Sequence, residues 1–501
     1  MAYTDIITKT DYCTGIQCPK ALWLKKNRPE LAKTPDGPDI HAENGKRVGM
    51  LARGYFGACT LVQPDGDKKK MADRTKELMA AGTDVIAEAS FLCDGRYCAV
   101  DLLRRDQNGW EMYEVKSSGN IEKYEDDISF QYYVLQRCGV NVRKAAILHI
   151  NKAYIRHGEL DIRQLFIAED CTAACVANEP AVEENIALLR DCLAQQDEPE
   201  RLLGKCCKDS DHECAFMPYC GRDIPARSVF DIAGLNWEQK FQYYNQGIVT
   251  YQDVLNNVSN LKAGQRLQIE TSLKNLPDHV EPEKIRSFLD ELTYPVYHLD
   301  FETFTEPIPS FDDEHPNEVI PFQYSLHIEH VDGMIEHREF LAEEGKDPRR
   351  AIAESLVKDI PTDVTVTAFH KSVEQNVLKG LADHLSELAP ELSEHLYAVR
   401  KNVKDLEIPF SKKAYYSDVM AGRSSIKAVL PALYPDDPAL DYHNLEGVHK
   451  GDEAAAAFLI LQSLPKKERE KTRNDLLKYC ELDTYAMVKV LEKLRKTLKQ
   501  Y

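Results

Sequence analysis

The sequence lacks the long apolar runs of a membrane protein and lacks any excess of positive charge. None of its 501 residues falls in an unbroken apolar stretch of eighteen, the length typical of a membrane-spanning helix. The N-terminal residues do not have the pattern of a signal peptide, so we expect a cytoplasmic protein. The formal net charge of −19 argues against a protein that coats nucleic acid nonspecifically. It is compatible with an enzyme that gathers carboxylates around metal ions.

Cysteine is nearly absent from the second half of the chain. Thirteen of the fourteen cysteines precede residue 221, and Cys480 is the exception. Because cytoplasmic chains rarely form disulfides, this distribution indicates metal or cluster ligands in the first half. Three thiols lie close together at Cys207, Cys214 and Cys220, with Cys206 as an alternative to Cys207. One more thiolate would complete a site for zinc or for an iron–sulfur cluster.

A predicted hairpin with charged side chains marks the first half of the chain. Residues 99–116 alternate between apolar and polar side chains on either side of an Asn-Gly turn, which predicts two antiparallel strands. Glu114 and Lys116 are two residues apart, so they project from the same face, and Asp101 on the neighbouring strand can join them. Two adjacent carboxylates favour a divalent cation such as Mg²⁺ or Mn²⁺, beside which a lysine can stabilise a phosphate. The alternative is an ordinary Glu–Lys pair on the surface.

The order of these residues resembles the core of the PD-(D/E)XK nucleases, and most closely their RecB-type branch. In that branch an Asp, a turn and a Glu-x-Lys strand are followed by a helix with Gln and an aromatic residue, which Gln131 matches here. An upstream helical histidine is matched by His41, for which a plain surface position is the alternative. The resemblance implies that His41, Asp101 and Glu114 bind metal and that Lys116 and Gln131 take part in catalysis.

Iron–sulfur members of the RecB-type branch have one cysteine before the nuclease core and three after it. Cys18, in the segment Cys-Pro-Lys-Ala-Leu-Trp, precedes the predicted core, and Cys207, Cys214 and Cys220 follow it. The resemblance therefore implies that these four thiolates hold a [4Fe–4S] cluster, with Zn²⁺ as the alternative. Cys13 is a weaker alternative to Cys18.

The second half of the chain opens with an apolar strand that carries Asp300 and Glu302. Being two residues apart, these acids face the same side of the strand, as in the first motif of RNase-H-like exonucleases. Tyr479 and Asp483 are four apart and share a helix face. They resemble the Tyr-x-x-x-Asp motif of DEDDy exonucleases, in which the tyrosine orients the attacking water and the aspartate completes the metal site.

One motif departs from the DEDDy pattern. Where that family has Asn-x-x-[Phe/Tyr]-Asp, this chain has His370-x-x-Val373-Glu374, and the longer side chain of Glu374 can change the metal spacing. Asp418 is an alternative ligand. The resemblance thus implies a catalytic Tyr479 and a second site for Mg²⁺ or Mn²⁺, formed by Asp300, Glu302, Glu374 and Asp483.

Over nearly its full length the chain is similar to a bacterial family that fuses these two modules, because several motifs recur in one order. We predict a restriction-endonuclease-like α/β domain at residues 1–224, a helical connector at 225–292 and an RNase-H-like α/β domain at 293–501. The implied function is a metal-dependent nuclease, an exonuclease acting on single-stranded DNA or DNA ends, or on RNA at the C-terminal module, in repair or defence.

Two alternatives to this function remain. The first is a nuclease with one active site, in which the other module only clamps nucleic acid, and the altered second motif favours the C-terminal module as the silent one. The second is a non-enzymatic subunit of a repair or defence complex.

Overall fold

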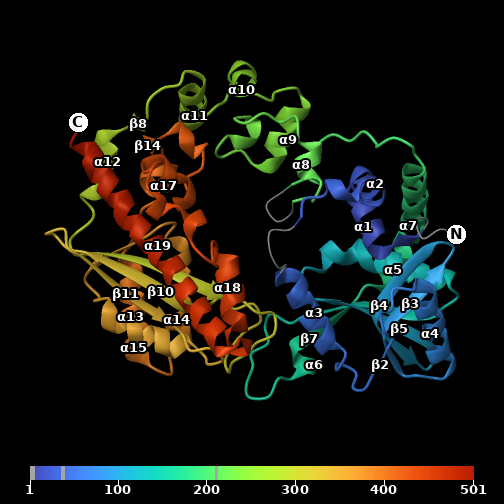
Figure 1. Ribbon diagram of the computed structural model, residues 1–501. Helices are drawn as coiled ribbons and strands as arrows, with labels where there is room; N and C mark the ends of the chain where they lie inside the picture. Colours follow the sequence, from blue (N-terminus) through green and yellow to red (C-terminus); the bar gives the residue numbers. More distant parts are fainter. Residues whose placement is uncertain (1–5, 35–39, 209–212, 501) are drawn as a thin grey trace. The chain divides into compact units, whose positions relative to one another are not determined.

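The computed structural model describes residues 6–34, 40–208 and 213–500 (Figure 1) and has a mixed α/β fold. It divides into two compact units: unit 1 is Met1–Asp223 with Glu306–Asn317, and unit 2 is Ile224–Thr305 with Glu318–Tyr501. The predicted connector, 225–292, therefore groups with the C-terminal sheet. Within the described residues, no helix is both long and apolar enough to cross a membrane.

Unit 1 is built on a seven-stranded sheet in the order β2-β3-β4-β5-β6-β7, with β1 beside β4. Strand β4 pairs antiparallel with β5 as far as Asp106 and Gly109, which confirms the predicted hairpin. Strand β6 continues the sheet parallel to β5. The strands are β1 (Ile7–Thr8), β2 (Thr60–Leu61), β3 (Val85–Cys93), β4 (Arg96–Asp106), β5 (Gly109–Lys116), β6 (Val142–Ile150) and β7 (Phe166–Asp170).

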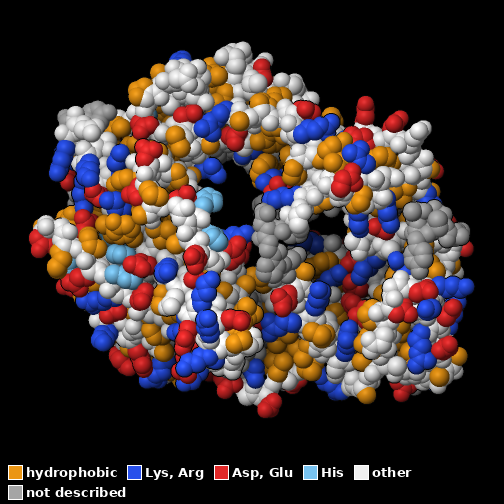
Figure 2. Space-filling view, in the orientation of Figure 1, with side chains coloured by type: hydrophobic (Ala, Val, Ile, Leu, Met, Phe, Trp, Pro, Cys, Tyr) orange, Lys and Arg blue, Asp and Glu red, His pale blue; other side chains and the backbone are white. Residues whose placement is uncertain are grey.

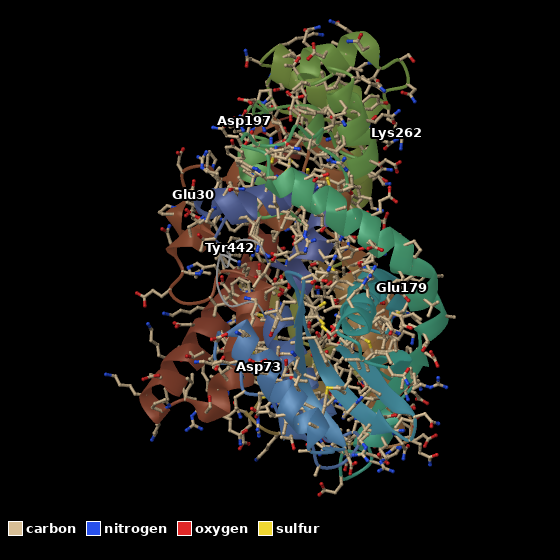
Figure 3. The ribbon with its side chains drawn as sticks, turned by 90° about the vertical axis from the view of Figure 1, so that its right-hand side faces the viewer. Glu30, Asp73, Glu179, Asp197, Lys262 and Tyr442 are labelled. Atoms are coloured by element: carbon tan, nitrogen blue, oxygen red, sulfur yellow. The ribbon has the colours of Figure 1, made fainter. Side chains whose placement is uncertain are left out.

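Helices cover both faces of this sheet. On one face, apolar side chains of α1, α4, α5 and α7 form a core with Met112 of β5. On the other face, α3 packs against Tyr113. Since side chains alternate along a strand, Glu114 and Lys116 share the face of α1 and α5. Figure 3 shows α4 and α7 from the side of the molecule, where they carry the labelled Asp73 and Glu179, respectively. The helices are α1 (Lys9–Gln17), α2 (Pro19–Asn27), α3 (Ile40–Ala52), α4 (Lys68–Ala80), α5 (Glu125–Arg137), α6 (Ile162–Leu165), α7 (Thr172–Leu193) and α8 (Met217–Cys220).

Unit 2 contains a five-stranded sheet in the order β11-β10-β9-β12-β13, so β9 is its central strand. Strands β9, β10 and β11 are antiparallel, whereas β12 and β13 run parallel to β9. A small separate sheet pairs β8 with β14. The strands are β8 (His279–Val280), β9 (Val296–Phe304), β10 (Ile320–Glu329), β11 (Ile335–Leu341), β12 (Thr365–Ala368), β13 (Val403–Asp405) and β14 (Tyr415–Tyr416).

The two faces of β9 have different partners. The apolar side chains of Leu299 and Phe301 pack against α13, α14 and α15, and the alternate residues face the long C-terminal helix α19, which crosses the sheet in Figure 1. This alternation places Asp300 and Glu302 under α19. The helices are α9 (Trp237–Asn245), α10 (Tyr251–Asn257), α11 (Ala263–Leu273), α12 (Pro282–Leu289), α13 (Arg349–Asp359), α14 (Ser372–Leu385), α15 (Pro390–Lys401), α16 (Ile408–Ser411), α17 (Ile426–Leu433), α18 (Gly451–Ile460) and α19 (Lys466–Leu498).

Charged side chains are mixed on the face of the molecule shown in Figure 2, where Lys and Arg alternate with Asp and Glu over each unit. A basic surface broad enough to dominate this face is not visible. This mixture agrees with the modest number of Lys and Arg residues and the net charge of −19.

Candidate active sites

The four acids predicted as C-terminal metal ligands come together in unit 2. Asp300 and Glu302 lie on β9, Glu374 lies in the first turn of α14, and Asp483 lies on α19. The charges of the other three acids all act on Asp300. Ligand atoms of Asp300, Glu302 and the neighbouring Cys480 fall within 4.8 Å of one another. The alternation of β9, the periodicity of the helices and the packing of α14 and α19 on the sheet thus place the four acids close together.

Burial and mutual repulsion hold protons on these acids. Burial is the largest cause that raises the pKa of Asp300 and of Glu302 well above the usual range, and Asp483 adds to both shifts. Burial likewise raises the pKa of Glu374 to about 8 and that of Asp483 to about 6. The Oε2 atom of Glu374 is buried without a hydrogen-bond partner. Divalent cations bound between these four acids would offset the repulsion between their carboxylates and favour their ionised form.

Two tyrosines and a lysine border the four acids. The Tyr442 hydroxyl donates a hydrogen bond to Asp483 Oδ1 at 2.7 Å. Lys427 Nζ, on α17, lies 3.3 Å from the Tyr479 hydroxyl and donates to the carbonyl of His449 at 3.0 Å. The helix spacing of Tyr479 and Asp483 pointed to this position from the sequence. Tyr442 was missed, because it lies in a short 3₁₀ turn that carries no recognisable pattern.

Asp418, the alternative ligand, is engaged by an arginine. Arg227 Nη2 donates to the Asp418 carbonyl at 2.6 Å and contacts its carboxylate at 3.3 Å. Glu374 instead follows a tight turn at the start of α14. In this turn His370 takes a left-handed φ of 71°, and its backbone N–H donates a hydrogen bond to Asp405 Oδ1 at 3.0 Å. A non-glycine residue is strained there. These contacts favour Glu374 over Asp418 as the third acid.

The raised pKa values predict how stability depends on pH. An acid whose pKa is higher in the folded chain binds more protons folded than unfolded, so stability falls as pH rises between the two values. For Glu374 this interval runs from the usual 4.5 to about 8. Metal-free protein should therefore lose on the order of a few kcal/mol between pH 5 and 8, and Mn²⁺ should restore more stability at pH 8 than at pH 6.

Thermal unfolding with and without Mn²⁺ would measure this effect. Glu374→Gln removes one of the four titrating acids and should reduce the pH dependence, whereas Glu394→Gln, an exposed glutamate on α15, is a matched control that should leave it unchanged. Equal pH dependence in both variants would contradict the assignment.

In unit 1, Glu114 is the centre of the predicted N-terminal site and is 2 % exposed. Lys116 Nζ donates to Glu114 Oε1 at 2.8 Å and also pairs with Asp127. Gln131 Nε2, on α5, donates to Glu114 Oε2 at 2.7 Å. Lys9, on α1, donates to the same oxygen as Lys116, at 2.6 Å. The structure thus brings Lys116 and Gln131 onto Glu114 and adds Lys9 and Asp127, which sequence reasoning missed.

The two predicted acids of unit 1 are in opposite electrostatic states. Burial, and then the charge of Glu114, raise the pKa of Asp101 well above its usual range. Burial would also raise the pKa of Glu114, but Lys9 and Lys116 outweigh it and lower that pKa to about 2. Asp101 Oδ2 accepts a hydrogen bond from the Val115 N–H at 2.6 Å. Glu114 is therefore neutralised by protein cations, while Asp101 is not.

His41, the further predicted ligand, belongs to α3, but its side chain lies outside the described residues. Its proposed role stays a prediction.

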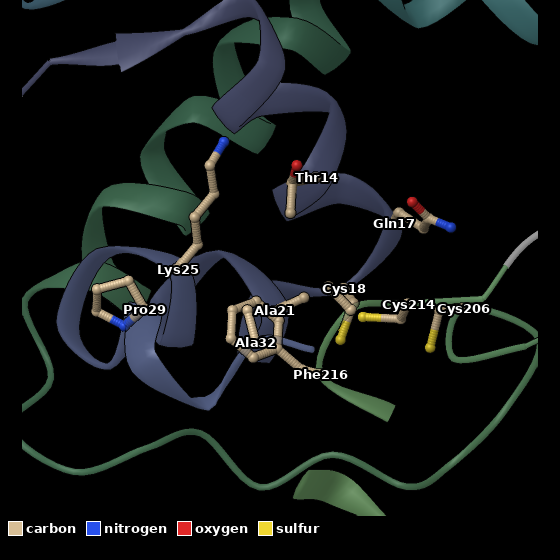
Figure 4. Close-up of a pocket in the computed structure, with 11 residues that line it drawn as sticks. Thr14, Gln17, Cys18, Ala21, Lys25, Pro29, Ala32, Cys206, Cys214 and Phe216 are labelled. Atoms are coloured by element: carbon tan, nitrogen blue, oxygen red, sulfur yellow. The ribbon is translucent and has the colours of Figure 1, made fainter. Parts of the chain in front are cut away.

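Three of the four predicted cluster cysteines, Cys18, Cys214 and Cys220, pack in one apolar group of unit 1 with Trp23, Phe216 and the alternative Cys206. Figure 4 shows three sulfur-bearing side chains, of Cys18, Cys206 and Cys214, beside a cavity of about 350 Å³. Two further thiols lie nearby: Cys207 Sγ is 3.8 Å from Cys206 Sγ, and Cys220 packs against the same apolar group.

The spacing of these thiols bears on which group they could hold. Four sulfur ligands at about 2.3 Å from one zinc ion lie about 3.8 Å apart. Among the described cysteines, no three sulfur atoms fall within 4.8 Å of one another. Thiolates of a four-iron cluster bind different iron atoms and stand further apart than the ligands of one zinc ion. Cys13 is elsewhere, under the influence of Asp127 and Lys9, which favours Cys18.

Comparison with known proteins adds two similarities. A family model described as a domain of unknown function (DUF2779) matches residues 297–425, a range that includes Asp300, Glu302 and Glu374 but ends before Tyr479 and Asp483. The chain is also 25 % identical over 293 residues to "Uncharacterized protein MG366" of Mycoplasma genitalium, an alignment that covers 52 % of this chain. The chain spans 43 % of the length of that relative, and its similarity to the family of unknown function covers nearly all of the five-stranded sheet and the positions of three of the four acids.

Proposed function

We propose that this protein is a metal-dependent nuclease that hydrolyses phosphodiester bonds of nucleic acid. The observation that carries the proposal is the group of four buried acids around Asp300, each with a raised pKa. Such a group is costly without cations, and it suits the two-metal sites of enzymes that act on phosphates. Mg²⁺ or Mn²⁺ bound there would activate water and stabilise the leaving oxygen.

The chain's own residues suggest how water would be oriented beside these acids. Burial, followed by the charges of Asp483 and Glu302, keeps the pKa of Tyr479 far above its usual range. Tyr479 therefore stays protonated and can hydrogen-bond a water or a phosphate oxygen without acting as a base. Lys427 Nζ, next to that hydroxyl, supplies a positive charge for a phosphate.

We further propose an RNase-H-like domain for the five-stranded sheet and a PD-(D/E)XK domain for unit 1. The first is supported by the acids of β9, the central strand, facing a C-terminal helix with Tyr479 and Asp483. The second is supported by Asp101 and Glu114 on adjacent strands, with Gln131 on the next helix. Single-stranded DNA or DNA ends are the favoured substrates, with RNA as an option for unit 2, in repair or defence.

A nuclease with a single active site is the second candidate, and one observation favours it. Lys9 and Lys116 already neutralise Glu114, and its pKa is lowered to about 2, whereas the acids of unit 2 lack comparable partners among the described residues apart from Lys427. On electrostatic grounds unit 1 is thus the better candidate for a clamp, the opposite of what the altered motif at Glu374 suggested.

The cleavage assay that tests the proposal uses full-length protein purified without oxygen. End-labelled single-stranded DNA and RNA are incubated with Mn²⁺ or with a chelator, and we expect cleavage only with the metal. A preparation that holds its metals yet cuts neither polymer would contradict the nuclease and support a non-enzymatic subunit.

The same preparation tests the cysteine group. We propose that Cys18, Cys207, Cys214 and Cys220 hold a [4Fe–4S] cluster, with Cys206 as the alternative to Cys207. The protein should be brown and contain about four iron atoms per chain, and Cys214→Ser should lose both colour and iron. Cys138→Ser, a partly buried thiol outside the cysteine group, is the control that should keep them. A colourless protein with zinc would contradict the cluster.

A further inference from the structure

A separate set of metal-binding side chains lies between β10, β11 and α19 in unit 2. His327 and His337 are direct neighbours across the antiparallel pair β10–β11, and their rings stack with centroids 4.5 Å apart. Glu481 Oε1, on α19, lies 3.9 Å from His337 Nδ1. One ligand atom from each residue falls within 4.8 Å of the other two. None of these residues belongs to the four acids described above.

Hydroxyl groups hold one nitrogen of each imidazole ring. Thr484 Oγ1 hydrogen-bonds His327 Nδ1 at 2.8 Å, and Ser325 Oγ hydrogen-bonds His337 Nε2 at 3.0 Å. The two hydroxyls are themselves joined at 2.7 Å. Histidines that bind metals are fixed through their other nitrogen in this way. The arrangement leaves His327 Nε2 and His337 Nδ1 as the nitrogens available to a ligand.

A fourth possible ligand lies on the same strand as His337. Glu339 lies two residues beyond His337 on β11, and the charges of His337 and Glu481 both act on it. A second carboxylate is therefore close to the three ligand atoms.

We propose that His327, His337 and Glu481 form a site for a zinc-like transition-metal dication, with Glu339 as the nearest fourth ligand. Two imidazoles and one carboxylate are a ligand set that zinc accepts, whereas Mg²⁺ prefers oxygen ligands alone. Ligands about 2.1 Å from a tetrahedral ion lie about 3.4 Å apart. In the structure the ligand atoms lie within 4.8 Å of one another. Glu481 is exposed on α19, so its side chain can rotate to bring the carboxylate closer to the two rings.

The site has a structural consequence. It would tie the C-terminal helix α19 to the β10–β11 hairpin through a face whose polar residues are buried, among them Ser325, His327 and Thr484. Buried polar groups are costly unless they are satisfied, and a bound ion would satisfy the free ring nitrogens. Helix α19 also carries Asp483, so the ion would help to fix the position of that acid.

Zinc content tests the site in the full-length chain. Protein freed of metal is dialysed against excess Zn²⁺ and then against buffer, and zinc per chain is measured in the wild type, His337→Gln, Glu481→Gln and a control, His330→Gln. His330 lies on the same hairpin but outside the three ligands, hydrogen-bonded to Glu336 at 2.9 Å. We expect one zinc fewer in the two ligand variants than in the wild type and the control. Zinc bound by the cysteines or by the four acids is present equally in all four proteins, so it does not affect the difference between them.

Thermal unfolding gives a second readout. Free zinc at 100 times its Kd should raise the Tm of the wild type and of His330→Gln by roughly 5–10 °C, and His337→Gln and Glu481→Gln should lose this part of the shift. Both ligand side chains are exposed, so these variants should fold. Equal zinc content in all four proteins, or a wild type that retains no zinc, would overturn the site.

Discussion

Asp300→Asn should reduce the Mn²⁺-dependent cleavage by unit 2 by at least about 100-fold. Asp300 lies on the central strand, where Asp483, Glu302 and Glu374 all act on it. Asparagine keeps the shape of the side chain but cannot ionise, so it cannot supply the negative charge that a bound metal ion would attract. Because two-metal chemistry depends on the charge of its ligands, metal occupancy should fall along with the rate. Cleavage rates measured over a series of Mn²⁺ concentrations would separate these two effects.

A matched substitution controls for damage to the fold. Asp418→Asn also neutralises a partly buried aspartate in unit 2, but one that pairs with Arg227, and its activity should stay near that of the wild type. Asp300→Asn should lower activity but raise the stability of the metal-free protein. Since burial, and then repulsion by the neighbouring acids, raise the pKa of Asp300, asparagine avoids the cost of protonating this side chain, and Asp300→Asn should stabilise metal-free protein at pH 8. An inactive variant that is also destabilised would mean that folding, and not metal binding, was lost.

Local periodicity explains which parts of the molecule could be predicted from the sequence. The period of two put Asp300 beside Glu302, and the helical period put Tyr479 on the face of Asp483. The hairpin that carries Glu114 followed from alternation around an Asn-Gly turn, and the structure confirms it. In each case the residues that meet are close in sequence or belong to one recognisable motif.

What escaped prediction depends on tertiary packing. Lys9 reaches Glu114 across 105 positions of sequence, and Tyr442 reaches Asp483 from a turn without regular structure. Helix α19 packs on β10 and buries the polar side chains of Gln323 and Ser325. The charge state of a site is therefore a property of the whole fold. Counting acids in motifs could not reveal that Glu114 is neutralised while Asp300 is not.

Lys9 and Lys116 both pair with Glu114, but we expect their substitution by alanine to have different effects on cleavage. Lys116→Ala should lower cleavage of single-stranded DNA by unit 1 by about 10²–10³-fold, because Lys116 shares a strand face with Glu114 and is the charge best placed to meet a phosphate. Lys9→Ala should instead lower the Mn²⁺ concentration needed for half-maximal activity, since Lys9 occupies the carboxylate oxygen that a metal ion would use. Both are measured in an Asp300→Asn background, which silences unit 2.

The control for these variants is Lys25→Ala on α2, whose ammonium pairs with Asp11 at 3.0 Å and not with Glu114. Its Mn²⁺ dependence should match that of the parent. If Lys116→Ala retained full cleavage, the charge at that position would serve only to balance Glu114. If the Asp300→Asn background itself cut no DNA, unit 1 would be a clamp, in which Lys9 and Lys116 balance the charge of Glu114.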